Sequence, residues 1–210
     1  MLFTVAPVTR RLTQRGKERR QQLMDYAAAR FAENGYHPTS VAEIVQGLGV
    51  GKGVFYWYFD SKEQLFVEIL RDAQQSLRRA QQQAIAGEDD PVRRIELGIR
   101  ASMRWSAEHR DVNQLIQFAI TDERFISAIR KGQEVAVADA MRHLSEGVER
   151  GLIRDADALM LAHAVLGVTT HLARVFIHQR NERADEVADA AVSFVLEGLL
   201  VPDAVVARPG

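Results

Sequence analysis

The hydrophobic residues of this chain recur with a helical period along most of its length. In the first such segment, 17–34, Leu23, Ala27 and Phe31 stand four residues apart and would form one buried face. The same period continues through about 40–48, 51–59, 61–85, 91–109, 112–120, 122–150, 156–180 and 184–200. No stretch alternates between polar and apolar residues as a half-exposed strand does. The sequence therefore predicts an all-α protein.

The ends of two short helices can be located from their capping residues. Ser40 is followed three positions later by Glu43, which is the pattern of a capping box at a helix start. Gly49 is expected to end that helix, because a tight turn often needs a positive φ that glycine adopts cheaply. Asp60 and Glu63 repeat the capping pattern for the long helix at 61–85. Two helices separated by a tight turn indicate a helix-turn-helix.

The second short helix, 51–59, carries an unusual number of aromatic residues. At about 100° per residue, Phe55 and Phe59 fall on one face and would anchor the helix. The other positions would be free to meet a partner, and they are Gly53, Val54, Tyr56, Trp57 and Tyr58. Rings with polar tips suit a surface that touches phosphates and thymine methyl groups. Packing of the same rings beneath a neighbouring helix is the alternative interpretation.

The segment GVGKGVFYWYFDSKEQLF, at 49–66, resembles the signature of the TetR/AcrR family of transcriptional regulators. The resemblance extends from about Gly16 to Leu70. It implies a three-helix DNA-binding head joined to a helical body that binds a ligand and forms a dimer. It also implies double-stranded DNA as the partner, with two half-sites read in the major groove.

Position by position, the resemblance assigns roles to individual residues of the helix-turn-helix. Lys52 and Gly53 would lie against the DNA at the helix start, and Tyr56 would bond a phosphate. The expected DNA-binding residues are Thr39, Ser40, Lys52, Gly53, Val54, Tyr56, Trp57, Tyr58 and Lys62, the last from the following helix. Gly51 and Val54 stand where the family often has Ser and Thr or Asn. Gly51 removes a capping hydroxyl, and Val54 leaves only apolar contact, so the operator preference stays open.

The charge distribution changes the picture given by the net charge of −1. Residues 1–62 carry nine Lys and Arg against five Asp and Glu, which leaves the rest of the chain acidic. A basic head on an acidic body is steered towards DNA. The chain has 210 residues and no cysteine, which excludes a disulfide framework and suits a cytoplasmic location. The sequence has neither the pattern of a secretion signal nor an uninterrupted apolar run of membrane-spanning length.

The composition and the resemblance together suggest three parts of the chain. We expect a flexible basic arm at 1–15, a helix-turn-helix DNA-binding domain at 16–62, and a helical effector-binding and dimerisation domain at 63–210. The clearest loop is GEDDP at 87–91, which by composition alone would be the boundary between head and body.

The last two predicted helices are apolar on more than one face, which favours a subunit interface. Deep burial within one subunit would produce the same pattern. The resemblance favours a homodimer, and the expected interface residues are Val165, Leu172, Phe176, Ala191, Phe194 and Val195. A two-fold dimer would place one recognition helix in each of two adjacent major grooves.

The sequence says less about a ligand. Methionine and aromatic side chains suit adaptable pockets, and the candidates in the body are Met103, Trp105, Phe118, Phe125, Met141, Met160 and Phe176. They suggest a small, largely apolar effector. The spacing of His163, His171 and His178 could bring them towards a metal ion, but no HExxH motif or cysteine accompanies them, so we predict neither a metal nor a cofactor.

These observations favour a DNA-binding transcriptional regulator that is not an enzyme, most simply a repressor released by its effector. Two alternatives stay open. One is a small helical enzyme, against which the missing acid–base constellation counts. The other is a dimerisation module that has lost DNA binding.

Overall fold

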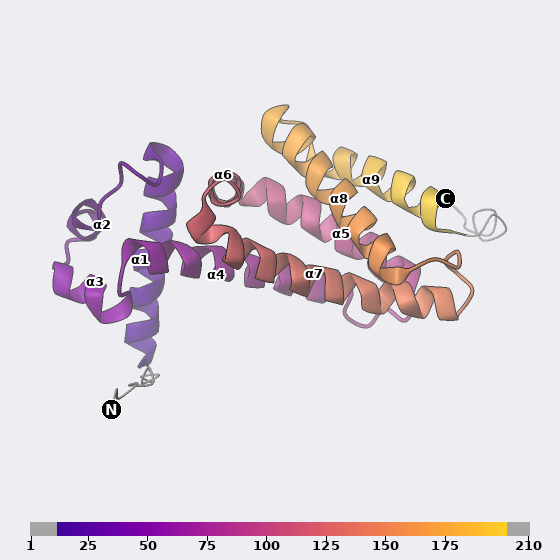
Figure 1. Cartoon of the computed structure of the whole chain (residues 1–210), viewed down its shortest axis with the longest axis horizontal. Coiled ribbons are helices and arrows are strands. Elements are labelled where there is room, and N and C mark those ends of the chain that lie inside the picture. Colours follow the sequence, from indigo (N-terminus) through magenta and orange to yellow (C-terminus); the bar gives the residue numbers. More distant parts are fainter. Residues whose placement is uncertain (1–11, 201–210) are drawn as a thin grey trace. The chain divides into compact units, whose positions relative to one another are not determined.

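The computed structural model describes residues 12–200, and this part of the chain is helical. Its elements are α1 (Gln14–Asn34), α2 (Val41–Gly47), α3 (Lys52–Tyr58), α4 (Lys62–Ala84), α5 (Pro91–Glu108), α6 (Arg110–Ala119), α7 (Glu123–Glu149), α8 (Ala158–Leu172), the π-helical segment η1 (Ala173–Gln179) and α9 (Ala184–Leu199). No strand occurs within 12–200, where an isolated bridge joins Ile153 to Leu200. The predicted all-α fold is confirmed (Figure 1).

The chain forms two compact units that divide between Ile69 and Leu70. The division falls inside α4, and neither residue 62 nor the 87–91 loop separates the units. Most of the predicted arm, 1–11, lies outside the described residues. Its last residues differ from the prediction, because α1 already begins at Gln14, with the Thr13 side chain accepting a hydrogen bond from the Gly16 backbone.

Unit 1 is held together by an aromatic core beneath α1. Phe31 lies 5.3 Å from Tyr36 and 5.6 Å from Phe66 between ring centroids, and all three rings are buried. Leu23 and Ala27 share the buried face of α1 with Phe31, as the spacing predicted. Gly35 ends this helix with a φ of 90°, which reverses the chain towards α2.

The capping residues around the helix-turn-helix were predicted only in part. Ser40 caps α2 and accepts a hydrogen bond from the Glu43 backbone at 3.1 Å. The Glu43 carboxylate, however, turns to Arg30, which donates to it at 2.9 Å, so the reciprocal half of the capping box is missing. At α4 the predicted pair was wrong, because Ser61 accepts from the Gln64 backbone at 3.1 Å, and the Gln64 side chain accepts from the Asp60 backbone.

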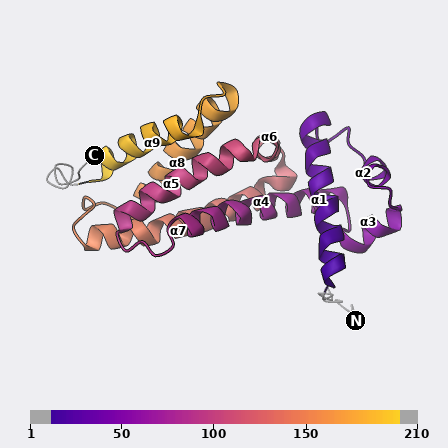
Figure 2. The same ribbon diagram turned by 180° about the vertical axis from the view of Figure 1, so that it is seen from behind.

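Unit 2 is a helical body around a core shared by α5, α7, α8, η1 and α9. The second half of α4 runs along α7 in both views of the ribbon (Figures 1 and 2). One polar contact joins this half of α4 to α7 through Arg78, and two join it to α5 through Ser76 and Gln81. Ser76 accepts a hydrogen bond from Trp105 at 3.1 Å, Arg78 pairs with Asp139 at 2.6 Å, and Gln81 donates to Ser102 at 2.8 Å.

The body helices begin and end close to their predicted limits. Asp90, Asp122 and Asp157 each accept a backbone hydrogen bond at the start of a helix. The predicted single helix at 156–180 instead changes at Ala173 from α-helix to the π-helical segment η1. Such segments often occur at functional sites.

The continuous helical segment Ala158–Gln179 is long and apolar enough to cross a membrane by length and composition, with a mean hydropathy of 1.4 in an 18-residue window. One such helix is weak evidence for a span, because helices that pack inside proteins pass the same test. Only 33% of the window is buried in the protomer.

Candidate nucleic-acid interface and effector site

The exposed face of α3 is the strongest candidate for a DNA-binding surface. Tyr56 and Trp57 are 55% and 50% exposed, whereas Phe55 is fully buried and Phe59 is 1% exposed. Lys52 stands four residues before Tyr56, so the two share the outward face at the start and middle of the helix. The predicted anchoring by Phe55 and Phe59 is therefore confirmed within the protomer, whereas of the five residues expected on the free face Val54 and Tyr58 are half-buried. Tyr58 is half-buried and lies beside Trp57, 4.5 Å between ring centroids.

The turn before α3 fixes the direction in which this face points. Gly49 has a φ of 64°, and the Val50 backbone donates to the Val45 carbonyl at 2.9 Å, which closes the turn after α2. Gly51 caps α3 in an extended conformation without a side-chain hydrogen bond, as its missing hydroxyl requires. Within this first turn the Val54 backbone donates to the Gly51 carbonyl at 3.0 Å, and no side chain of the cap residue bonds the N–H groups of Lys52 and Gly53.

Lys62 has a different role from the one that the resemblance implied. Its ammonium group donates to the carbonyl oxygens of Tyr36 and Thr39, both at 2.9 Å, and to that of His37 at 3.4 Å. It also lies 4.3 Å from the centroid of the Tyr36 ring. An ammonium has three protons, and here each has a backbone acceptor. This geometry favours a positioning role, in which Lys62 ties the start of α4 to the 36–39 segment before α2.

Thr39 and Ser40 were both expected at the DNA surface. Thr39 is fully buried, and its hydroxyl donates to the Gly35 carbonyl at 2.9 Å. A direct side-chain contact from Thr39 is therefore wrong, because the hydroxyl faces the protein interior. Ser40 is exposed at the start of α2 and stays a candidate.

Several cations of unit 1 are taken up by internal ion pairs. Arg20 pairs with Glu68 at 2.7 Å and Arg30 with Glu43 at 2.9 Å. Lys52, by contrast, is exposed and has no ion pair among the residues that the structure describes. Its charge is therefore available to a phosphate at the start of α3.

In the body, most of the residues predicted to form the effector site do not line its two cavities. Met103 and Phe125 are fully buried, and Phe125 packs on Phe118 at 6.0 Å between ring centroids. Met141 and Phe176 pack against the main core, whereas Met160 is 72% exposed. Trp105 alone of the seven lines either cavity. Composition identified apolar side chains but could not distinguish core residues from cavity walls.

The first cavity, of about 90 Å³, lies among α4, α5, α7 and α8. Its apolar walls include Ile95, Ile99 and Val165, but charged and polar side chains also line it: Arg78, Arg94, Arg142, Asp139, His143, Gln81, Gln82 and Ser102. Burial and the positive charges of Arg94 and Arg142 lower the pKa of His143 below its usual range. The cavity therefore combines apolar walls with charged and polar groups.

A second cavity, of about 170 Å³, lies next along α5 and reaches η1. Its lining includes Trp105, Ile116 and Leu77 together with the polar residues Ser102, Ser106, Asn113, Gln117, Thr169, Thr170 and Arg174. Ser106 also contacts His178 of η1 at 2.8 Å. Burial and the charge of Arg110 lower the pKa of His178.

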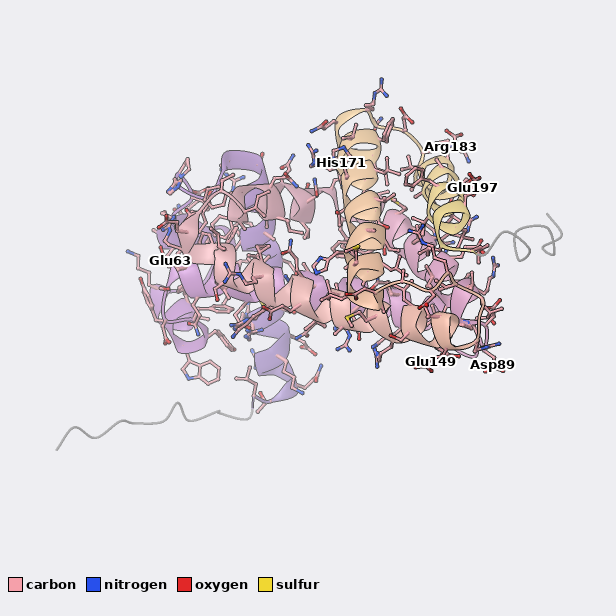
Figure 3. The ribbon with its side chains drawn as sticks, turned by 45° about the vertical axis from the view of Figure 1, so that its right-hand side comes forward. Glu63, Asp89, Glu149, His171, Arg183 and Glu197 are labelled. Atoms are coloured by element: carbon pink, nitrogen blue, oxygen red, sulfur yellow. The ribbon has the colours of Figure 1, made fainter. Side chains whose placement is uncertain are left out.

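The predicted dimer residues separate into two groups. Val165, Ala191 and Val195 are buried in the core of their own protomer, so their assignment to an interface was wrong. Phe194 is 67% exposed, and Leu172 and Phe176 are half-buried. His171 on α8 and Glu197 on α9 are also exposed (Figure 3). The outward faces of these helices carry small residues as well, among them Ala164, Gly167, Ala190 and Gly198.

Within 12–200, no group of three or more His, Cys, Asp or Glu side chains is arranged to hold a metal ion. His163 and His171 are exposed on α8, and His178 is half-buried against Ser106.

Comparison with known proteins matches residues 23–69 to the family described as bacterial regulatory proteins, tetR family. The chain is also 31% identical over 189 residues to the HTH-type transcriptional repressor KstR2 of Rhodococcus jostii (strain RHA1), covering 88% of this chain and 92% of that protein. It is 27% identical over 191 residues to the HTH-type transcriptional activator FasR of Mycolicibacterium smegmatis, covering 87% and 83% of the two chains.

The fold has a solved counterpart over nearly the whole chain. The structure of the ketosteroid transcriptional regulator KstR2 of Mycobacterium tuberculosis matches with a TM-score of 0.67 and 26% identity, covering 87% of this chain and 95% of that one.

Proposed function

Because this chain belongs to the TetR family and is a DNA-binding transcriptional regulator, we propose that it represses transcription as a ligand-responsive homodimer. The face of α3 formed by Lys52, Tyr56 and Trp57 carries this proposal. It is exposed, aromatic and cationic, and the buried Phe55 and Phe59 hold it rigidly on unit 1.

The three side chains of this face offer complementary contacts to a duplex. The Lys52 ammonium supplies charge for a phosphate, and the Tyr56 hydroxyl can donate to a second phosphate oxygen. Trp57 has an apolar ring and one donor, which suit a base edge or a thymine methyl group. Gly53 leaves room beside them, since a Cβ added there would meet nothing within 4 Å. This surface would enter the major groove as the recognition helix.

A dimer would follow from the outward faces of α8 and α9. Phe194 is a large apolar side chain in water, and the small residues around it permit close helix approach. Two copies of this face would form a two-fold interface, which would pair two α3 helices with two half-sites about one helical turn apart. Only one-third of the apolar 18-residue window within Ala158–Gln179 is buried in the protomer, which supports the same interface.

Control by a small molecule would act through α4. Residues of this helix between Leu77 and Gln82 line the two body cavities described above, and its first residue is Lys62, which holds the 36–39 segment before α2. A ligand that binds better to a displaced α4 would shift the population towards a form with mispositioned recognition helices. Repression released by ligand is the simplest outcome of that coupling.

The relatives are transcriptional regulators rather than enzymes. One of them is a repressor and another an activator, so the sign of regulation rests on the proposed coupling. Action on chromosomal DNA implies a cytoplasmic location. The alternative of a module without DNA binding predicts that the α3 face can be changed without consequence.

Selection from a random-sequence duplex pool tests this proposal and identifies the operator in the same experiment. The purified full chain should enrich a palindromic site, and fluorescence anisotropy on that site should show a sharp loss of affinity with added salt. Equal binding to selected and unselected duplexes would contradict the proposal. Sedimentation of the free protein as a monomer at micromolar concentration would contradict the dimer.

A further inference from the structure

Cavity-lining cations in the body indicate what kind of effector this protein binds. Four arginines of the body share two carboxylates, and they are Arg78, Arg142, Arg94 and Arg150. Arg78 and Arg142 both donate to Asp139, and Arg94 and Arg150 both donate to Glu146. Arg78, Arg94 and Arg142 line the first cavity, whereas Arg150 does not. These two networks therefore hold more positive than negative charge.

Within these networks, the Arg94 guanidinium group has one N–H group without a hydrogen-bond partner among the described residues. Its Nη2 atom donates to Glu146 at 2.6 Å and its Nη1 atom contacts His143 Nδ1 at 3.2 Å. Its Nε atom is buried and has no hydrogen-bond partner among the described residues. A buried N–H group without an acceptor is costly, so a rearrangement of Arg94 towards an acceptor in the cavity would be favoured.

His143 adds a second donor of the same kind. Because Arg94 Nη1 can only donate, His143 Nδ1 must accept, which leaves the proton of the neutral ring on Nε2. The lowered pKa of His143 is consistent with this neutral ring at pH 7. Arg94 and His143 thus both line the first cavity and both carry N–H donors, for which an oxygen-rich anion is the complementary group.

Other acidic side chains near these arginines do not act as the anion that would complement Arg94 and His143. Asp89 and Glu149 lie at the same end of the body (Figure 3). Neither of them lines the cavity, and the only contacts described between Asp89 and these arginines are through its backbone carbonyl. Asp139, the one acid in the lining, is already shared by Arg78 and Arg142.

The remainder of the cavity is apolar and continues towards the second one. Ile95, Ile99 and Val165 form part of its wall, and Ser102 lines both cavities. Between them the Gln81 side chain donates to Ser102 at 2.8 Å, and Ser102 donates to the Gly98 carbonyl at 2.7 Å. At about 90 and 170 Å³, each cavity is smaller than the roughly 300 Å³ usual for a ligand pocket. A ligand of ordinary size would need both, with the Gln81–Ser102 contact opened.

From this arrangement we infer that the effector is an amphipathic monocarboxylate whose carboxylate binds Arg94 and His143 and whose aliphatic tail passes Ser102 towards Trp105. This inference deepens the proposed function and depends on it only for its regulatory consequence. It also refines the expectation of a small, largely apolar effector to a ligand with an apolar tail and one charged end.

Isothermal titration calorimetry of the full chain without DNA tests the ligand class. The probes are octanoate, its uncharged isostere octanamide, and octylamine, all below their aggregation thresholds. We expect octanoate to bind at least tenfold more tightly than octanamide and octylamine not to bind. Among butanoate, hexanoate, octanoate and decanoate, affinity should rise by up to about fourfold per methylene until the tail is full. Equal affinity for octanoate and octanamide, preference for the amine, or no binding in the series would overturn the inference.

Two variants test whether the carboxylate of the ligand binds Arg94. Arg94→Gln should bring the octanoate-to-octanamide ratio to within about threefold of unity. Arg150→Gln is the matched control, because Arg150 shares Glu146 with Arg94 but does not line the cavity, and its ratio should stay at the wild-type value. A wild-type ratio in Arg94→Gln would refute the assignment. If Arg94→Gln does not fold, the wild-type comparison of octanoate with octanamide still decides the ligand class.

Binding to the selected duplex distinguishes a failure of the proposed regulator from a failure of the proposed ligand site. A chain that binds its duplex but ignores octanoate retains the proposed regulator and loses this inference. A chain that binds octanoate but no DNA loses the regulator and retains the ligand site.

Discussion

The two tryptophans of this chain mark two surfaces that the sequence encodes in different ways. Trp57 is half-exposed on α3 and belongs to a surface built from neighbours within one short stretch. Trp105 is 9% exposed and lines a cavity whose walls also come from four other elements of the body, α4, α6, α8 and η1. A surface built from one segment can be predicted from local spacing. A cavity depends on which helices meet, and local spacing does not contain that information.

The largest effect is expected where the α3 surface is anchored. Phe55→Ala removes a fully buried ring and should lower the free energy of unfolding by about 3–5 kcal/mol. Chemical denaturation followed by circular dichroism measures this loss. The neighbouring substitution Tyr56→Ala, at a 55% exposed position, should change stability by no more than about 0.5 kcal/mol. Similar losses for both would contradict the separation of α3 into two faces.

The next effect concerns DNA rather than stability. Trp57→Ala should weaken binding to the selected duplex by about 1–3 kcal/mol, which is about fivefold to 150-fold, because its side chain is proposed to touch base edges. Anisotropy titrations of the folded variant measure the change. Phe194→Ala serves as a comparison, because Phe194 is exposed on α9 and is not part of the α3 surface. Its effect should decline as the protein concentration is raised, whereas that of Trp57→Ala should persist.

A smaller effect, of opposite sign, is expected in the body. Gly98 lies inside α5 and lines the first cavity, and a Cβ added there would meet nothing within 4 Å. Gly98→Ala should raise the free energy of unfolding by about 0.5–1 kcal/mol, because alanine is the better helix former. Thermal unfolding of the free protein would show the gain, and a lower melting temperature would indicate that the added methyl group is not accommodated.

The smallest effect is a dependence of stability on pH that originates in the body. Burial lowers the pKa values of His143 and His178, so the folded state favours their neutral rings. Their contribution should be constant above the unfolded pKa of about 6.5 and should be lost as pH falls from that value through the folded pKa values. Denaturation at pH 7.5, 6.5 and 5.5 tests this, with a His143→Gln/His178→Gln double variant as the reference. An equal decline in the double variant would assign the pH dependence to other groups.

The helices themselves were largely predictable because their ends carry local signals. Asp90, Asp122 and Asp157 cap body helices, and Gly35 and Gly151 adopt the positive φ that a helix end often needs. The π-helical segment η1 was missed, because its amino acids have the same helical period as α8. Periodicity reports the presence of a helix but does not distinguish an α-helix from a π-helix.

A site was easier to predict when its residues lie close together in the sequence. The anchoring residues of α3 followed from spacing, and the resemblance favoured a free face for its other rings. The contacts of Lys62 could not be predicted in this way, because its acceptors lie more than twenty residues earlier in the chain. The cationic lining of the first cavity was missed for the same reason, since Arg78 meets Asp139 only after α4 packs along α7. Most of the apolar residues that composition suggested for the effector site instead pack in the protein core.

The most direct test of the DNA-binding surface uses Trp57 as its own reporter. Trp105→Phe leaves Trp57 as the only tryptophan in the chain, and acrylamide quenching of its emission measures its exposure with and without the selected duplex. If the α3 face enters the groove, the duplex should protect Trp57 from quenching, and an equal concentration of a non-binding duplex should not. Unchanged quenching of Trp57 in a complex that anisotropy shows to be fully formed would contradict the central claim.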